Sequence, residues 1–236
     1  MLSAVLLCAE TPDHAASPTL ASILQSHANA IKDMHLREPR SHETIGEMLG
    51  LGVTGDFHEW QDGSKQRRDD SIGIRTVREL RVGDRLYVQN PNGDVRELHG
   101  LLAQRQVTED FIDSGAFAAH PESVTLLGPA ALADGRNCYR LRITPPSGEP
   151  YNIAIDAKTW LIDEKSYLDG DDYQTITYTD YHVVDGMLVP YLEVQSNGDH
   201  QYDVGDDVCG IKASARLQRD KGRNHGIHAL ACTQPC

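Results

Sequence analysis

The stretch that decides the fold runs from Asn137 to Gly198 and reads NCYRLRITPPSGEPYNIAIDAKTWLIDEKSYLDGDDYQTITYTDYHVVDGMLVPYLEVQSNG. Apolar and polar residues alternate within it, as in Tyr139–Ile143 and Tyr151–Ile155. A period of two predicts strands that bury one face and expose the other. Turn dipeptides such as Asp169-Gly170 and Asp185-Gly186 separate these runs, and such pairs favour tight hairpins. The stretch is therefore typical of an antiparallel meander.

The same signals extend toward the N-terminus and past the end of this stretch. Further turn dipeptides stand at Asp62-Gly63, Asn92-Gly93, Asp134-Gly135 and Asn197-Gly198. The strands that we expect include Gly55–Trp60, Arg85–Gln89, Trp160–Tyr167, Gln174–Tyr181 and Met187–Val194. Together these runs predict one antiparallel sheet of about seven or more strands. Pro190 cannot donate a backbone hydrogen bond, so the last strand should be an edge strand or a bulged one.

Two segments have a helical pattern instead. From Ser17, a capping residue followed by proline, apolar residues such as Leu20, Leu24 and Ile31 recur close to one helix face. This helix should end near Arg37, before a polar stretch that reaches about Glu47. A second helix is expected over 101–117.

Size and charge limit the classes of function. The 236 residues, 39% hydrophobic and 24% charged, support one sizeable core, which we assign to residues 17–204. The net charge of -13 opposes binding to nucleic acid, because phosphates must be neutralised by lysine or arginine. No run is long and apolar enough for a membrane helix, so we expect no transmembrane segment. The arginines between Arg67 and Arg81 are interpreted as a solvated strand face, although they would also suit an anionic head group or an acidic partner.

Both ends of the chain have a different character. Residues 1–16 begin with the apolar run MLSAVLLCA, which resembles a partial signal segment without a basic start. Residues 205–236 show no clear period, and we expect a tail without regular structure. The five cysteines have no framework spacing, so the disulfide state stays open for Cys138, Cys209, Cys232 and Cys236.

The stretch from Asn137 also resembles the sheet of the LolA/LolB superfamily of bacterial lipoprotein carriers. The resemblance rests on the residues Ile155-Asp156, Thr159-Trp160-Leu161, Tyr178, Asp180-Tyr181, Val184-Asp185-Gly186, Leu188 and Pro190. Upstream, GLGVTGDFHEW, Gln61-Asp62 and NPNGDVRELHG look like the domain that precedes the protease in bacterial retropepsin-like aspartyl protease proteins. No such protease follows in this chain.

The resemblance implies a mainly β (α+β) fold: a curved, half-open antiparallel sheet, or incomplete barrel, wrapped around one to three helices. In the lipoprotein carriers the hollow of this sheet holds acyl chains. The resemblance implies an apolar hollow here too. The alternation points Leu86, Val88, Leu141, Ile143, Ile153, Ile155, Ile176 and Tyr178 into it, and we expect Trp60 and Trp160 near its rim. Buried apolar residues often form a closed core instead, so this set has two interpretations.

One string invites an enzymatic interpretation. Phe111–Ala116 spells FIDSGA, the apolar-apolar-Asp-Ser/Thr-Gly-Ala pattern of aspartic proteases. Such a protease needs a second carboxylate, supplied by another motif or by a dimer, and an aspartate in a loop between strands. Asp113 follows a helical pattern, so we interpret Ser114 and Gly115 as the end of a helix and expect no enzyme.

Two groups of residues invite a metal interpretation. His225, His228, Cys232 and Cys236 are zinc-ligand types, but their spacing matches no zinc finger known to us, and a solvated tail is the simpler interpretation. Asp169, Asp171 and Asp172 offer oxygens for calcium, but they too lack a known spacing and fit a hairpin tip. We expect no metal site and no cofactor.

The sequence therefore predicts a non-catalytic periplasmic or secreted domain that holds a lipid or acylated chain in an apolar hollow. The alternative is an auxiliary domain for folding or partner contact, derived from an aspartyl protease family protein and without a small ligand. An open hollow would favour the first, and a hollow filled by the protein's own helices the second. The sequence does not reveal the oligomeric state.

Overall fold

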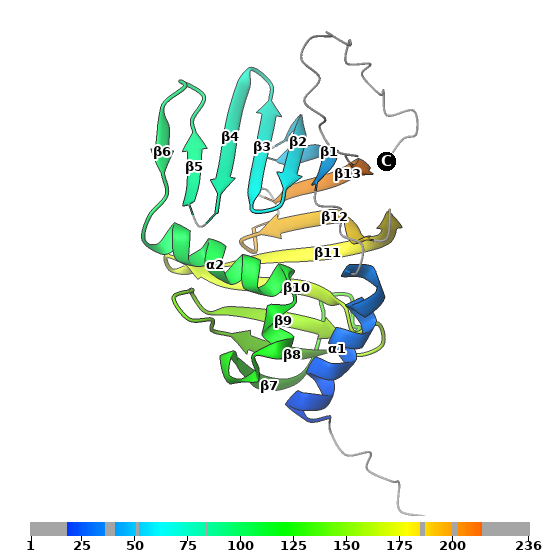
Figure 1. The fold of residues 1–236 in the computed structure, drawn as a ribbon. Coiled ribbons are helices and arrows are strands. Elements are labelled where there is room, and N and C mark those ends of the chain that lie inside the picture. Colours follow the sequence, from blue (N-terminus) through cyan, green and yellow to red (C-terminus); the bar gives the residue numbers. More distant parts are fainter. Residues whose placement is uncertain are drawn as a thin grey trace, which may run out of the picture.

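The protein folds into one large antiparallel sheet that curves around two α-helices (Figure 1). The computed structural model describes residues 18–35, 41–50, 52–83, 85–184, 187–199 and 203–213. The helices are α1 (Leu20–His35) and α2 (Leu101–Asp113), followed by the 3-10 turns η1 (Ala116–Ala119) and η2 (Pro121–Ser123). The strands are β1 (Ser41–Gly50), β2 (Val53–Asp62), β3 (Lys65–Ile72), β4 (Arg75–Val82), β5 (Arg85–Gln89), β6 (Val95–Glu97), β7 (Val124–Ala131), β8 (Asn137–Ile143), β9 (Tyr151–Asp156), β10 (Ile162–Asp169), β11 (Asp172–Val184), β12 (Met187–Ser196) and β13 (Val204–Ala213).

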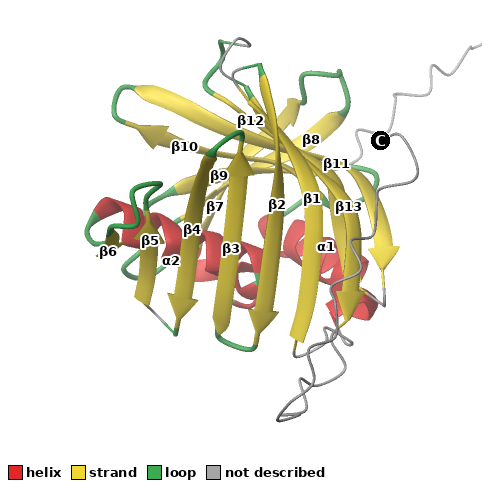
Figure 2. Ribbon diagram, turned by 90° about the horizontal axis from the view of Figure 1, so that it is seen from above, coloured by secondary structure: helices red, strands yellow, loops and turns green. Residues whose placement is uncertain are grey.

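The strand order confirms the predicted half-open sheet. It is β6-β5-β4-β3-β2-β1-β13-β12-β11-β10-β9-β8-β7, so the sheet has thirteen strands and is not closed into a barrel. The two edge strands, β6 and β7, are consecutive in the chain, and α2 with η1 and η2 connects them. This connection must run from one edge of the sheet to the other. It does so inside the curve, where both helices lie (Figure 2).

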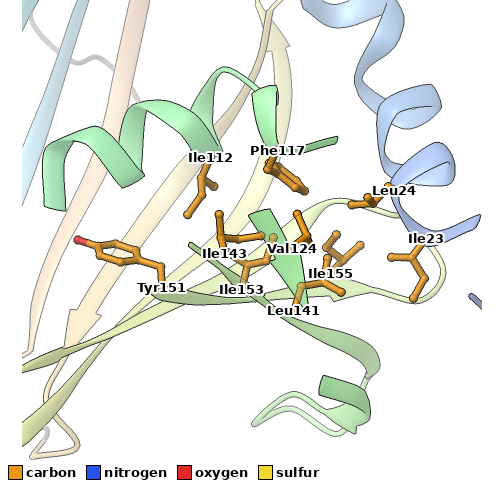
Figure 3. Close-up of a cluster of buried hydrophobic side chains, with 10 residues drawn as sticks. All are labelled: Ile23, Leu24, Ile112, Phe117, Val124, Leu141, Ile143, Tyr151, Ile153 and Ile155. Atoms are coloured by element: carbon orange, nitrogen blue, oxygen red, sulfur yellow. The ribbon is translucent and has the colours of Figure 1, made fainter. Parts of the chain in front are cut away.

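The hydrophobic core lies in one half of the sheet. Its strand residues all come from β7, β8 and β9, and α1, α2 and η1 cover them. Figure 3 shows this cluster, which consists of Ile23, Leu24, Ile112, Phe117, Val124, Leu141, Ile143, Tyr151, Ile153 and Ile155. In β1–β6 the described residues contribute only Met48 and Phe57 to the buried apolar side chains. The half formed by β1–β6 therefore depends on pairing between strands more than on an apolar core.

Three strands lie where the sequence shows no apolar alternation: β1 was not predicted, and β3 and β4 were interpreted only as a solvated strand face. β1 lies in the predicted polar stretch, and its buried positions are two glycines and Met48. β3 and β4 carry the arginine-rich stretch, whose charges pair with acids on the same strands: Arg67 and Arg78 both bind Asp69, at 2.5 Å and 3.1 Å. Neither pattern looks apolar in the sequence. Backbone pairing on both sides of β1, with β2 and β13, stabilises it instead.

The prediction of an unstructured tail from residue 205 was wrong for its first part. Residues 205–213 belong to β13, which pairs with both β1 and β12 and so joins the half formed by β1–β6 to the half formed by β7–β12. Their pairing partners are distant in sequence, so no local period reveals them. Residues 214–236, with the candidate zinc ligands, lie outside the described residues, as does the candidate signal segment 1–16.

Pro190 was expected on an edge or bulged strand, but β12 lies between β11 and β13. The described pairing of β12 with β13 covers only Leu192–Gln195. Pro190 lies outside that ladder, so its missing N–H breaks no hydrogen bond to β13. Its partner in β11 is Tyr181.

Candidate functional site

An apolar pocket lies on the concave side of the sheet, between α1, the end of α2 and strands β10–β12. Its volume is about 320 Å³. Apolar side chains from both helices and three strands form most of its wall. The complete lining is His27, Ile31, Ile112, Asp113, Gly115, Leu161, Ile162, Lys165, Tyr178, Tyr181, Leu188, Pro190 and Glu193.

One wall of this pocket carries an ion pair between a buried lysine and an exposed aspartate. The Lys165 ammonium donates a hydrogen bond to Asp113 at the end of α2 and lies 5.0 Å from the centre of the Tyr178 ring. Burial alone would lower the pKa of Lys165, but the Asp113 carboxylate and Tyr178 hold that pKa well above its usual range. The ammonium therefore stays charged, and its charge is neutralised by Asp113.

A second carboxyl group, that of Glu193 on β12, also lines the pocket. Burial raises the pKa of Glu193 to about 7, and the nearby Lys165 ammonium opposes that rise. Among the described residues Glu193 has no lysine or arginine within ion-pair distance. The pocket thus combines an apolar wall with one paired and one unpaired carboxyl group.

The strands switch face beside this pocket. Tyr178 and Tyr181, three residues apart on β11, both line it, although strict alternation would send them to opposite faces. Asp180 between them has a φ of 55°, in the left-handed region. The ladder with β12 omits the pair at this point, since Thr179 pairs with Leu192 and Tyr181 pairs with Pro190. This local irregularity turns Tyr181 inward and widens the apolar wall.

A second, polar hollow lies between β2–β5 and α2, with a volume of about 780 Å³. Asp113 lines both hollows, so they meet at the end of α2. The second hollow is lined by Glu59, Gln61, Gln66, Arg68, Glu79, Arg81, Leu86, Gln106, Glu109, Asp110, Asp113 and Ser114. Arg81 bridges its two sides by donating to Asp110 on α2 at 2.6 Å. The concave face therefore holds an apolar compartment next to a polar one.

The structure separates the ten residues that the sequence suggested for an apolar hollow. Four of them, Leu141, Ile143, Ile153 and Ile155, are at most 1% exposed in the core beneath the helices. Tyr178 lines the apolar pocket, and Leu86 lines the polar one. Ile176 is buried next to Lys165, and Val88 pairs with Glu79 on the face of the polar hollow.

The two tryptophans of that set lie elsewhere. Trp60 follows Glu59, which lines the polar hollow, so Trp60 points to the opposite, convex face of the sheet. There it stacks on His58 with 3.6 Å between ring centres and lies under the Arg67 guanidinium. Trp160 occupies the turn before β10 with a φ of 62°, and its ring packs against the core and stacks on Tyr139. The backbone carbonyl of Trp160 is bound by His27 at 2.8 Å.

Sequence reasoning missed most of the pocket wall. His27, Ile31, Leu188 and Glu193 come from α1 and β12, which no local pattern brings together. Asp113 was singled out for the protease-like string, and Pro190 for its effect on the strand. No sequence signal marked Lys165 either, because its place opposite the core residue Ile153 depends on the register of β10 against β9, which only the structure shows.

The FIDSGA string forms the end of a helix, as predicted. Ser114 follows the last residue of α2, and Gly115 has a φ of 68°, the left-handed conformation that ends many helices. Asp169 and Asp172 are paired at the β10–β11 hairpin tip, and Arg105 binds Asp169 at 2.9 Å. Within the described residues no group of three or more histidine, cysteine or carboxylate side chains is arranged to hold a metal ion. Cys138 is buried with a free thiol.

No family model and no curated protein matches this sequence. Solved structures do match. A DUF1329 family protein from Desulfovibrio piger has a TM-score of 0.53 at 13% identity, with 83% of this chain and 94% of that chain covered. A LolA superfamily protein from Nitrosomonas europaea has a TM-score of 0.53 at 14% identity, with 84% and 94% covered. The chain has the LolA-like fold. The relation to aspartyl protease proteins stays a prediction.

A third structure with the LolA-like fold is a domain from Vibrio parahaemolyticus provisionally assigned to outer membrane lipoprotein sorting. It matches with a TM-score of 0.52 at 10% identity, and the match covers 83% of this chain and 94% of that one. The match spans nearly the whole of each neighbour, so this likeness concerns the complete sheet and not one hairpin. Within the described residues no helix combines the length and apolar character needed to cross a membrane.

Proposed function

We propose that this protein is a non-catalytic binding module that holds the chain of a lipid or acylated molecule in the pocket between α1 and β10–β12. The observation that carries the proposal is that pocket: an apolar hollow on the concave face of a LolA-like sheet. The neighbour provisionally assigned to lipoprotein sorting supports the same class of ligand. A periplasmic or secreted location goes with this proposal and stays a prediction.

The size of the pocket suits one chain. Its volume of about 320 Å³ lies at the lower end of the range of roughly 300–1,000 Å³ that is usual for small-molecule sites. Each methylene that leaves water contributes about 0.8 kcal/mol, so about ten methylenes contribute about 8 kcal/mol before the cost of immobilising the chain. Micromolar affinity is the expected outcome.

The fold explains why the pocket lies where it does. The helices cover β7–β9 closely, and the core there is closed. Farther along the sheet, α1 faces β12 across the pocket, and Ile31 marks its helical wall. The apolar surface of β10–β12 is therefore only partly covered by the protein's own side chains.

The test is a titration with N-phenyl-1-naphthylamine, an uncharged apolar fluorophore that brightens when it leaves water. We expect saturable binding to the full chain. The variant Ile31→Trp fills the pocket and should weaken binding about tenfold or more. The matched control Lys32→Trp adds the same ring at the neighbouring exposed position and should bind like the wild type.

Circular dichroism of both variants checks that each is folded. If the folded wild type shows no saturable binding, the carrier proposal fails and the alternative of an auxiliary domain stands. Equal binding by the Ile31→Trp variant and the wild type would place the fluorophore outside this pocket.

A further inference from the structure

Every lysine or arginine that lines the two hollows is already paired with a carboxylate. Lys165 lines the apolar pocket, and Arg68 and Arg81 line the polar hollow. Their partners are Asp113 for Lys165, Asp70 at 2.7 Å and Asp206 at 2.6 Å for Arg68, and Asp110 at 2.6 Å for Arg81. The Nε of Arg81 has no acceptor, but this atom is buried and out of reach of a ligand. Among the described residues of the two linings, no lysine or arginine is left for an anionic ligand.

The carboxylates of the two linings are in excess. Together the linings contain six carboxyl groups against these three cations. Four of the six, those of Glu59, Glu79, Glu109 and Glu193, have no lysine or arginine within ion-pair distance among the described residues. Glu109 accepts a hydrogen bond from the Tyr151 hydroxyl at 3.1 Å, and burial raises the pKa of Glu109. The hollow therefore has unused acceptors.

We propose that the occupant is a long-chain amphiphile with a positively charged amine head group, its chain in the apolar pocket and its head in the polar hollow. The inference rests on the proposed function, since it requires that the apolar pocket takes a chain. The two hollows meet at Asp113, so a chain seated beside Lys165 directs its head toward Glu109 and Glu59. An ammonium group there gains charge-assisted hydrogen bonds. A carboxylate or phosphate head would face unpaired carboxylates with no free cation.

The experiment measures displacement of N-phenyl-1-naphthylamine from the full chain by three molecules with the same twelve-carbon tail. Dodecylamine is cationic, monododecanoylglycerol is neutral and dodecanoate is anionic at about pH 8. We expect dodecylamine to displace the fluorophore at a concentration about tenfold or more below that of dodecanoate, with the neutral ester between them. High salt should narrow this difference, because it screens charges at an open hollow.

Glu59→Gln combined with Glu79→Gln keeps the shape of the polar hollow and removes two of its unpaired charges. This variant should lose most of the preference for the amine and keep its affinity for the neutral ester. Glu47→Gln, which removes a charge from the exposed face of β1, should behave like the wild type. Equal affinities for the three molecules, or a preference for dodecanoate, would overturn the head-group inference and leave the proposed function standing. Failure of all three, and of the fluorophore, would overturn both.

Discussion

The stability of the folded protein should depend on pH, because the pocket buries the carboxyl group of Glu193. Burial raises the pKa of Glu193 in the folded protein from 4.5 to about 7. Between these two values the folded protein keeps a proton that the unfolded chain has released. The stability of the wild type therefore falls as the pH rises through this window, and above about pH 7 the full cost of the buried charge is present.

The magnitude follows from the same two values. A difference of one in pKa corresponds to about 1.4 kcal/mol, so the interval from 4.5 to about 7 corresponds to at most about 3.5 kcal/mol. Solvent at the mouth of the pocket screens part of this cost, and we expect about 1–3 kcal/mol. Glu193→Gln has no proton to exchange. It should be more stable than the wild type by that amount at about pH 8, and the gain should vanish toward about pH 4.

Urea unfolding of both proteins at a series of pH values measures this difference directly. Other buried acids, such as Asp163, also have a raised pKa, but they titrate in both proteins and cancel in the comparison. Glu47→Gln controls for the loss of one charge. A gain from Glu193→Gln that stays constant from about pH 4 to about pH 8 would show that Glu193 does not titrate in the folded protein as its burial requires.

Three further predictions concern the scaffold around the pocket. Arg105→Met should lower the free energy of unfolding, measured by urea denaturation, by about 3 kcal/mol, because it leaves the partly buried Glu149 without its partner at 2.8 Å. The control Arg142→Met changes an exposed arginine and should cost little. Equal losses of stability in the two variants would contradict the role of this ion pair. Gly115→Ala should lower the free energy of unfolding by about 1–2 kcal/mol, because the φ of 68° disfavours a side chain and the new Cβ would lie 3.1 Å from Ile31. A thermal midpoint equal to that of the wild type would refute this loss of stability. Ile153→Ala should cost about 3–4 kcal/mol in the closed core, and the fully exposed Ile74→Ala should be close to neutral; similar effects of both would argue against a core centred on β7–β9.

The sequence by itself determined the class of the sheet, because the signals for it are local. Alternation in Tyr151–Ile155 and turns such as Asp169-Gly170 act between neighbouring residues, and the structure places strands and a hairpin there. The signal for the end of α2 is also local in the sequence. Gly115 ends the helix whatever lies around it, so the protease-like string could be interpreted correctly without a structure.

The tertiary structure alone decided which surfaces became core and which became pocket. Ile153 and Tyr178 both alternate in their strands, yet one lies beneath the helices and the other lines the hollow, because the path of α2 from edge to edge determines what is covered. The place of β13 also depends on partners far away in the chain. The pairing of charges also depends on the tertiary structure. Lys165 and Asp113 are 52 residues apart, and only the curvature of the sheet around α2 makes them a pair. Periodicity records which face a residue takes, whereas burial and pairing depend on what the rest of the chain brings to that face.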